Sequence, residues 1–295
     1  MSTFRVGWIG CGVMGLQMAG HVLRSGFPLS VYSKTRSKCE PLLSQGAQWE
    51  DSPVQVARTC DIICMIVGYP SDVESVVLDP ESGVIAGLRP NAVVVDLTTS
   101  TPALAKKIYE EVSSRGGQAL DAPVSGGDIG ARNGTLSIMI GGHEEAYERA
   151  IPVLKCFGKN IRLMGPPGSG QHTKMSNQIV IASGMVGVVE GLLYAERAGL
   201  EPSEVIAVIE KGAAASFSLS SYGPRILRGD YEPGFFVDHF IKDMGIALKE
   251  AEHMGLKLPG LSLAYDLYNQ LKEMGFGKKG TQALMLALKK MNQRE

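Results

Sequence analysis

The sequence predicts an α/β domain with a doubly wound parallel sheet, followed by an all-α domain. Up to about residue 165, short apolar runs of strand length alternate with segments whose apolar residues recur at helical spacing. This alternation is typical of βαβ units, whose strands pair in parallel. From Gln171 onward no strand pattern follows. We therefore expect a first domain over residues 1–165 and a second over residues 166–295.

The elements of the first domain follow from apolar runs and from helix start and stop signals. Gly26 ends the first helix, Ser52-Pro53 begins a short helix, and Thr101-Pro102 begins another. Parallel strands buried on both faces are expected to be continuously apolar. Such strands are predicted at residues 5–9, 29–32, 62–67, 93–96, 118–120, 136–140 and 161–163.

The second domain begins with a long helix over residues 171–197 that is apolar on most of its faces. A helix of this kind is buried, which is typical of a connection between domains or an interface between subunits. We therefore expect a homodimer or a homotetramer. Shorter amphipathic helices are predicted near residues 202–212, 239–254, 261–274 and 281–292.

Composition argues against several classes of function. The chain has 29 Lys and Arg against 30 Asp and Glu, without the basic stripe that nucleic-acid binding requires. No uninterrupted run of about 18 apolar residues occurs, so we expect no membrane span. The five cysteines lack zinc-site spacing, so no metal is expected. The first strand begins by residue 5, which leaves no room for a signal or transit segment, so a cytoplasmic protein is the default expectation; a trimmed organellar precursor would look the same.

Residues 10–15 have the Gly-x-Gly-x-x-Gly pattern that holds a dinucleotide pyrophosphate between a strand and a helix. The first glycine permits the tight turn, the second lets the backbone approach the phosphates, and the third lets the helix pack on the strand. An ordinary glycine turn is the alternative, because glycine is common here (36 of 295), but the flanking strand and helix favour the dinucleotide. We expect cofactor contacts from Gly10, Cys11, Gly12, Val13, Met14 and Gly15.

The residues after the second strand indicate which dinucleotide binds. An acid at this point accepts from the ribose 2′-hydroxyl and favours NAD, whereas basic and hydroxyl groups suit the extra phosphate of NADP. The acid is missing, and Ser33, Lys34, Thr35 and Arg36 offer hydroxyls and positive charge. NADP is therefore favoured; NAD is the alternative cofactor, and a solvated basic turn is the alternative interpretation of the segment.

Two glycine-containing segments carry candidate chemical groups, and the first of them suits a carboxylate. Residues 121–127 follow a strand, and the small residues near Ser125 expose backbone amides to an anion. In the second segment, Lys174, Asn177 and Gln178 lie at i, i+3 and i+4 and share one face of the long helix. A lysine at the start of an apolar helix is costly to bury. The alternatives are an ordinary glycine turn for the first segment and a lysine extending to the surface for the second.

These motifs together resemble the β-hydroxyacid dehydrogenase family, which includes 3-hydroxyisobutyrate dehydrogenases, tartronate semialdehyde reductases and glyoxylate/succinic semialdehyde reductases. The similarity runs from Val6 to about Leu288 and is strong to plant 3-hydroxyisobutyrate dehydrogenase-like proteins. The segments that carry it are the glycine triplet, Asp96-Leu97-Thr98-Thr99, residues 121–127, residues 168–177 and Lys242-Asp243.

The resemblance implies a role for each matching residue. Lys174 would be the general acid and base, Ser125, Gly126 and Gly127 would hold the substrate carboxylate, and Asn177 would orient the substrate. Many members have a second Asn where this chain has Gln178, so the sequence leaves open which amide faces the substrate. Phe235 and Asp243 would shape the substrate pocket, while Val67, Thr99 and Lys242 would contact the cofactor.

The resemblance therefore implies an NADP(H)-dependent enzyme that interconverts a short β-hydroxyacid and its semialdehyde. A non-catalytic NADP sensor or scaffold on the same fold is the alternative, but relatives of that kind have replaced the lysine that this chain keeps. Imine reductases usually lack it as well, and 6-phosphogluconate dehydrogenases carry a much larger helical domain. The choice of hydroxyacid depends on side-chain shape around the carboxylate site, which the sequence does not determine.

Overall fold

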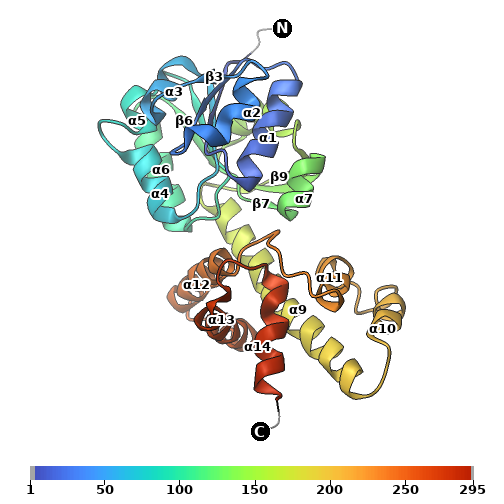
Figure 1. Cartoon of the computed structure of the whole chain (residues 1–295). Coiled ribbons are helices and arrows are strands. Elements are labelled where there is room, and N and C mark those ends of the chain that lie inside the picture. The colour runs from blue at the N-terminus through green and yellow to red at the C-terminus, as the bar shows by residue number, and fades with distance from the viewer. Residues whose placement is uncertain (1–3, 294–295) are drawn as a thin grey trace. The chain divides into compact units, whose positions relative to one another are not determined.

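The computed structural model describes residues 4–293 (Figure 1). The chain divides into two compact units, and the boundary along the sequence lies between Lys174 and Met175. Unit 1 precedes this point and unit 2 follows it. Helix α9 (Ser169–Arg197) contains the division, so it contributes residues to both units.

Unit 1 is built on a nine-stranded sheet of order β3-β2-β1-β4-β5-β6-β8-β7, with β9 paired to β8. The expected parallel sheet is confirmed from β3 through β6, whereas β8 is antiparallel to both β6 and β7. The strands are β1 (Val6–Ile9), β2 (Leu29–Tyr32), β3 (Gln48–Trp49), β4 (Ile62–Met65), β5 (Val93–Asp96), β6 (Gln118–Asp121), β7 (Val124–Ser125), β8 (Leu136–Gly141) and β9 (Gly158–Gly165).

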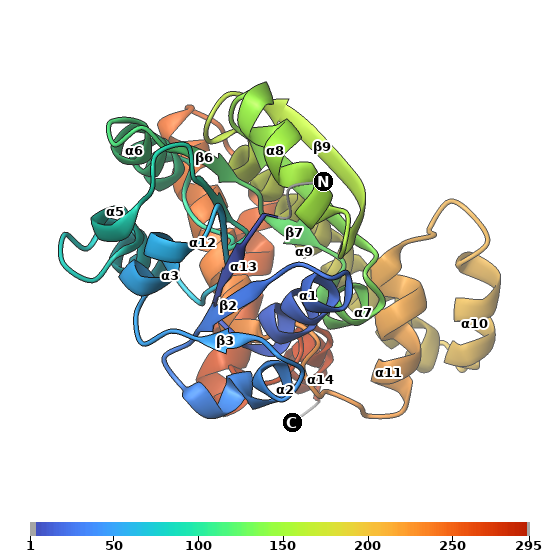
Figure 2. The same ribbon diagram turned by 90° about the horizontal axis from the view of Figure 1, so that it is seen from above.

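Both faces of the sheet are buried, as a doubly wound fold requires. Alternate residues of β4 enter different core clusters: Ile62 and Cys64 enter one, and Ile63 and Met65 the other. The covering helices lie around the sheet in Figure 2. They are α1 (Val13–Arg24), α2 (Glu40–Leu43), α3 (Pro53–Thr59), α4 (Pro70–Leu78), α5 (Val84–Gly87), α6 (Pro102–Ser113), α7 (Gly127–Asn133) and α8 (Glu144–Leu154), with a short 3₁₀ turn at Arg36–Cys39.

Proline begins three of these helices, because its fixed φ suits the first helical position. The Thr101 hydroxyl accepts from Leu104 N at 3.2 Å, so it is a true cap of α6. Ser52 precedes α3 but makes no side-chain capping bond, so at α3 the proline alone supports the predicted start.

Among the described residues of unit 2 the regular elements are helices joined by turns and loops, with one isolated bridge between Phe236 and Gly280. Its core contains the buried rings of Phe240 and Tyr268, which meet edge to face, and the Tyr268 hydroxyl donates to Thr281 O at 2.8 Å. The helices after α9 are α10 (Pro202–Ile209), α11 (Gly223–Leu227), α12 (Val237–His253), α13 (Pro259–Leu271) and α14 (Leu284–Met291), with π turns at Ser218–Tyr222 and Lys272–Phe276 and a 3₁₀ turn at Thr281–Ala283.

Helix α9 is long and apolar enough to span a membrane by length and composition, and 39% of its most apolar window is buried within the structure. Core helices of water-soluble proteins meet the same criterion. Gln171, Lys174 and Gln178 are buried on this helix, and an interior that receives polar side chains with hydrogen-bond partners is typical of a core helix that serves a site.

Candidate active site

The turn between β1 and α1 has the geometry that each glycine of the triplet was expected to permit. Gly10 has φ +97°, and a Cβ there would clash with the Ile66 carbonyl oxygen. A Cβ at Gly15 would clash with the Gly10 carbonyl oxygen, so only glycine lets α1 approach the strand this closely. At Gly12 nothing lies within 4 Å of the Cβ position, which leaves open space beside the backbone.

This turn fits a dinucleotide pyrophosphate. The first backbone amides of an α-helix have no carbonyl partner within the helix. Helix α1 begins at Val13 and has no side-chain cap either, so its first amides are left to bind an anion in the open space at Gly12. The Cys11 side chain is buried beside Cys39, and burial raises the pKa of the Cys11 thiol. The Cys11 side chain is therefore a buried thiol, and we expect any contact of Cys11 with a dinucleotide to come from its backbone.

The end of β2 carries the cations expected near the adenine ribose. Ser33 Oγ accepts a long hydrogen bond from Cys11 N at 3.5 Å, which places this end beside the glycine turn. Lys34 Nζ forms an ion pair with Asp72 at 2.6 Å, and the Arg36 guanidinium lies over the Trp49 ring at 5.2 Å. The two cations therefore differ: one is already paired with an acid and the other is held against an aromatic face.

The ends of β4 and β5 are tied together next to the glycine turn. Val67 N donates to Thr98 Oγ1 at 3.0 Å, and Thr98 N donates to the buried Asp96 carboxylate at 2.9 Å. Because β4 and β5 are neighbours in the sheet, Val67 and Thr99 lie at one edge, where ligands of such folds bind.

Two buried side chains attach the start of α9 to this edge. The Asp121 carboxylate accepts from Gly168 N and Gln171 N, both at 2.8 Å. Gln171 is fully buried; its Oε1 accepts from Ser100 N at 2.9 Å and its Nε2 donates to Thr98 O at 2.8 Å. Burial raises the pKa of Asp121, although the backbone N–H groups oppose that shift. Neither role was predicted from the sequence, because each depends on partners 47 to 73 residues away.

Lys174 lies in unit 1 beside the loop predicted to hold a carboxylate. Its ammonium donates to Val124 O at 2.8 Å, and the residue is 7% exposed. The loop continues through Ser125 to Gly126 and Gly127, whose φ values of +129° and +62° favour glycine. The structure thus brings the predicted proton donor and the predicted carboxylate loop together, with a buried cation whose charge attracts an anion.

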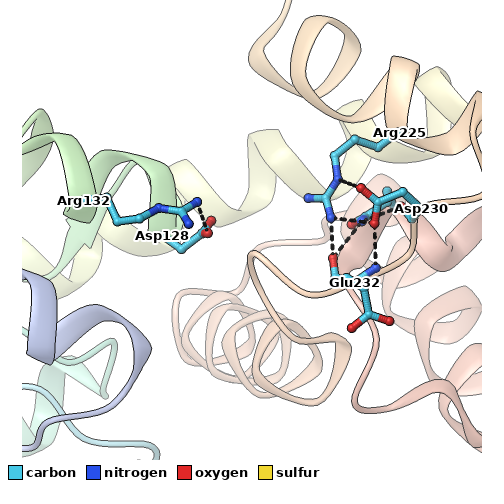
Figure 3. A network of polar contacts seen from close by, with 6 residues as sticks. Asp128, Arg132, Arg225, Asp230 and Glu232 are labelled. Carbon is cyan, nitrogen blue, oxygen red and sulfur yellow. Dashed lines mark hydrogen bonds and ion pairs between the residues drawn. The ribbon is translucent and has the colours of Figure 1, made fainter.

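The same loop continues into α7, which packs on α1. Arg132 pairs with Asp128 across one turn of α7 at 2.7 Å (Figure 3). The His21 ring donates from Nε2 toward the carbonyl oxygens of Ala131 and Arg132, at 3.1 and 2.9 Å. These carbonyls end α7, so His21 links the carboxylate loop to the helix that begins at the glycine turn.

In unit 2, the predicted amides and acid form a chain of hydrogen bonds. Asn177 Nδ2 donates to Gln178 Oε1 at 2.7 Å, and Gln178 Nε2 donates to Asp243 Oδ2 at 2.6 Å. Lys242 Nζ lies 3.0 Å from Asp243 Oδ1, and the acid is 1% exposed. Both ends of the Gln178 amide are therefore committed to other side chains.

The segment before Phe235 is held by hydrogen bonds and an ion pair that were not predicted from the sequence (Figure 3). Arg225 binds both carboxylate oxygens of Asp230, at 2.8 and 3.0 Å, and also donates to Glu232 O at 2.7 Å. This contact lowers the pKa of Asp230 to about 2. Gln282 Nε2 donates to the carbonyl oxygens of residues 230 and 232, both at 3.1 Å. The Phe235 ring packs 5.4 Å from the ring of Phe240.

A cleft of about 290 Å³ lies elsewhere in unit 1, and none of the predicted site residues lines it. Its walls include Tyr109, Gln118 and His143, so it lies at the amino-terminal end of β6, opposite the strand ends described above. Within residues 4–293, no group of three or more His, Cys, Asp or Glu side chains is placed to hold a metal ion.

Two family models cover nearly all of the chain. Residues 5–165 match the NAD binding domain of 6-phosphogluconate dehydrogenase. Residues 168–288 match the NAD-binding domain of NADP-dependent 3-hydroxyisobutyrate dehydrogenase.

Curated relatives and solved structures are similar over almost the whole length. A probable mitochondrial 3-hydroxyisobutyrate dehydrogenase-like protein of Arabidopsis thaliana is 50% identical, covering 99% of this chain and 87% of the relative. The 2-hydroxy-3-oxopropionate reductase of Escherichia coli is 37% identical, covering 97% and 98%. The crystal structure of a Salmonella typhimurium 3-hydroxyisobutyrate dehydrogenase superposes with a TM-score of 0.88 at 29% identity, covering 96% and 99%. Psf3 in complex with NADP+ and 2-OPP gives 0.89 at 25% identity, covering 96% and 99%.

Proposed function

Because the chain belongs to the 3-hydroxyisobutyrate dehydrogenase-like family of NAD(P)-dependent oxidoreductases, which act on the CH–OH group of hydroxyacids, we propose that it interconverts a short β-hydroxyacid and its semialdehyde with NADP(H). The candidate substrates are 3-hydroxyisobutyrate, tartronate semialdehyde, succinic semialdehyde and glyoxylate. Residues 1–165 would form the cofactor domain and residues 166–295 the substrate and dimerisation domain. The observation that carries the proposal is the buried Lys174 ammonium next to the Ser125–Gly127 loop.

The proposed mechanism divides hydride and proton between two sources. When bound, the nicotinamide cofactor would be held by the glycine turn of residues 10–15 together with Val67, Thr99 and Lys242, and it would supply the hydride for reduction of the semialdehyde carbonyl. The Lys174 ammonium gives a proton to the carbonyl oxygen as negative charge develops there, which yields the hydroxyl and leaves a neutral amine. In the oxidative direction the neutral amine accepts the hydroxyl proton. The Ser125 hydroxyl and the backbone of Gly126 and Gly127 hold the substrate carboxylate near this group.

The hydrogen bonds of unit 2 favour Asn177 as the amide that faces the substrate. Gln178 uses its oxygen for Asn177 and its nitrogen for Asp243. It therefore orients Asn177 and Asp243, and Phe235 contributes an apolar wall to the pocket. Lys242, paired with Asp243, is assigned to the cofactor together with Val67 and Thr99.

The decisive experiment replaces Lys174 with Ala and measures turnover and NADPH binding separately. We expect turnover to be lost while the dissociation constant for NADPH, followed by its fluorescence, stays within about twofold, because the general acid is needed for proton transfer alone. Lys159→Ala on β9 is the control, since this lysine is exposed and is not one of the predicted site residues. Unchanged turnover of the Lys174 variant would overturn the mechanism. Steady-state kinetics on the four candidate substrates, with each cofactor, identify the hydroxyacid.

Assembly and location complete the proposal. We propose a homodimer or homotetramer through α9, since Gly184, Gly187 and Gly191 lie exposed along that helix with nothing within 4 Å of their Cβ positions. A second helix can approach such a face closely, and a monomer in light scattering would contradict the assembly. We also propose that the enzyme works in the cytoplasm, with no membrane or nucleic acid as partner; a fluorescent fusion that accumulates in an organelle or on a membrane would contradict this.

A further inference from the structure

We propose that Asp72 sets the balance between NADP and NAD by withholding Lys34 from the 2′-phosphate, which leaves Arg36 as the cation that recognises it. The inference rests on the proposed use of NADP(H) and assigns a selectivity role to an acid outside the strand that normally carries one. It concerns one ion pair and one stacked cation at the end of β2.

The ion pair joins two strand ends on either side of β1. Lys34 follows β2, and Asp72 lies in the first turn of α4, which follows β4. Both strands pair with β1, so their carboxyl ends reach the same edge of the sheet as the glycine turn. Lys34 Nζ and Asp72 Oδ1 are 2.6 Å apart, with side-chain exposures of 73% and 27%. The carboxylate is therefore the more fixed partner, and it places a negative charge at the ribose edge.

Arg36 is positioned differently. Its guanidinium lies 5.2 Å from the centre of the Trp49 ring, and Trp49 is on β3, which pairs with β2. Tyr32 supports this ring at 5.9 Å. Within residues 4–293, no acid forms an ion pair with Arg36. Stacking restricts the guanidinium while leaving its N–H groups available for the bidentate contact that phosphate favours.

Charge decides how these groups affect the two cofactors. A phosphate monoester carries nearly two negative charges at neutral pH, so a nearby carboxylate repels it and competes with it for Lys34. A carboxylate can instead accept a hydrogen bond from the free 2′-hydroxyl of NAD. Asp72 therefore weakens NADP binding and leaves NAD binding unchanged or improved. The pair is exposed, so the effect is moderate: removing the charge should tighten binding of the 2′-phosphate about three- to tenfold.

The test uses two ligands that differ only in the 2′-phosphate: 2′,5′-ADP and 5′-AMP. Calorimetry measures the dissociation constant of each for the wild-type protein and for Asp72→Asn. We expect the variant to bind 2′,5′-ADP about three- to tenfold more tightly, with 5′-AMP within about twofold, and the gain to shrink as salt rises. Glu74→Gln is the matched control, because Glu74 lies on the same helix and pairs at 2.7 Å with Lys107, which is not at the ribose edge.

Variants of the stacked cation test the second half of the proposal. Arg36→Ala should make the two ligands bind equally, whereas Trp49→Phe keeps an aromatic face and should retain most of the preference for 2′,5′-ADP. Trp49→Leu should lose more of that preference, and circular dichroism checks that each variant folds. Equal preference in Trp49→Leu and the wild type would overturn the role of the stacking.

The outcomes separate this inference from the proposed cofactor preference. If the wild type prefers 2′,5′-ADP but Asp72→Asn matches Glu74→Gln, the inference is wrong and the preference for NADP stands. If the wild type binds both ligands equally while Asp72→Asn prefers 2′,5′-ADP, the role of Asp72 stands, whereas recognition of the 2′-phosphate by Arg36 and the proposed NADP preference are both wrong.

Discussion

Gln171 is the residue whose replacement tests most directly how the site is assembled. Its amide binds Ser100 N and Thr98 O, on either side of Thr99, while its own backbone N–H binds Asp121. One side chain therefore links the segment assigned to the nicotinamide with the helix that carries Lys174. The change we consider is Gln171→Leu, which has similar length and no hydrogen-bonding group.

The structure allows the cost of this change to be estimated. Ser100 N and Thr98 O would lose buried partners at 2.9 and 2.8 Å, and each unsatisfied group costs about 1–3 kcal/mol. Two such groups, less the gain from burying an apolar side chain, suggest a loss of about 3 kcal/mol in the free energy of unfolding. A displacement near 1 Å between the hydride and proton donors costs about a hundredfold in rate, so we expect kcat to fall about ten- to a hundredfold.

Kinetics and ligand binding distinguish positioning from general destabilisation. Leu154→Ala is a matched control, because Leu154 is fully buried in α8 and its truncation also costs about 3 kcal/mol. At a temperature where both variants are folded, we expect kcat to fall for Gln171→Leu alone. The affinity for 2′,5′-ADP, which reports the other end of the cofactor site, should be unchanged in both. If the two variants keep the same kcat, Gln171 is a structural residue only and the reasoning fails.

Three further predictions follow from ionisable side chains. Arg225 lowers the pKa of Asp230 from 3.8 to about 2. Their contact therefore stabilises the folded protein above pH 3.8, and this stabilisation is lost as the pH falls through about 2. Asp230→Asn should remove this contribution to acid unfolding, which circular dichroism measures. Burial lowers the pKa of His239 below 6.5, so the unfolded chain binds the proton first and stability falls as pH drops below 6.5. Urea midpoints at pH 7.5 and 5.5 should therefore converge in His239→Gln, and an unaltered difference would contradict this assignment. Burial also raises the pKa of Cys11, whereas Cys156 is partly exposed, so a maleimide should label Cys156 first in the folded protein, as peptide mass spectrometry can check.

Most of the strands that sequence patterns predicted consist mainly of buried residues; the exception is β9, whose predicted residues 161–163 are partly or fully exposed. β4 is apolar from end to end and β5 is apolar up to its last residue, Asp96, because helices cover both faces; the predicted runs contain both strands. β3 and β7 have two residues each, which is too short for a period to appear. The antiparallel position of β8 also escaped prediction, since a short apolar run has the same appearance in either direction.

Some residues of the candidate site could be predicted from the sequence, and others could not. The glycine turn of residues 10–15 was predictable because its spacing along the chain is itself the signal, whereas the role predicted for Lys174 came from the resemblance to a family. Asp121 and Gln171 were visible as residues, but their roles depend on hydrogen bonds to distant backbone groups. The Lys34–Asp72 ion pair could not be predicted for the same reason. Lys34 was predicted to contact the cofactor, but the acid that pairs with it is 38 residues away in the sequence.

The continuity of α9 explains why one helix can serve both units. The backbone N–H groups of Gly168 and Gln171 donate to the Asp121 carboxylate and fix the start of the helix, and Gln178, seven residues after Gln171, donates to Asp243. Between these anchors, Lys174 and Asn177 are separated by three residues, or about 4.5 Å along the axis, and they point to one side. Helix geometry therefore sets the backbone spacing of the proposed proton donor and the proposed substrate amide. A substrate held by Asn177 would be presented to Lys174 by the same rigid element, while Gln171 holds that element against the strand ends assigned to the cofactor.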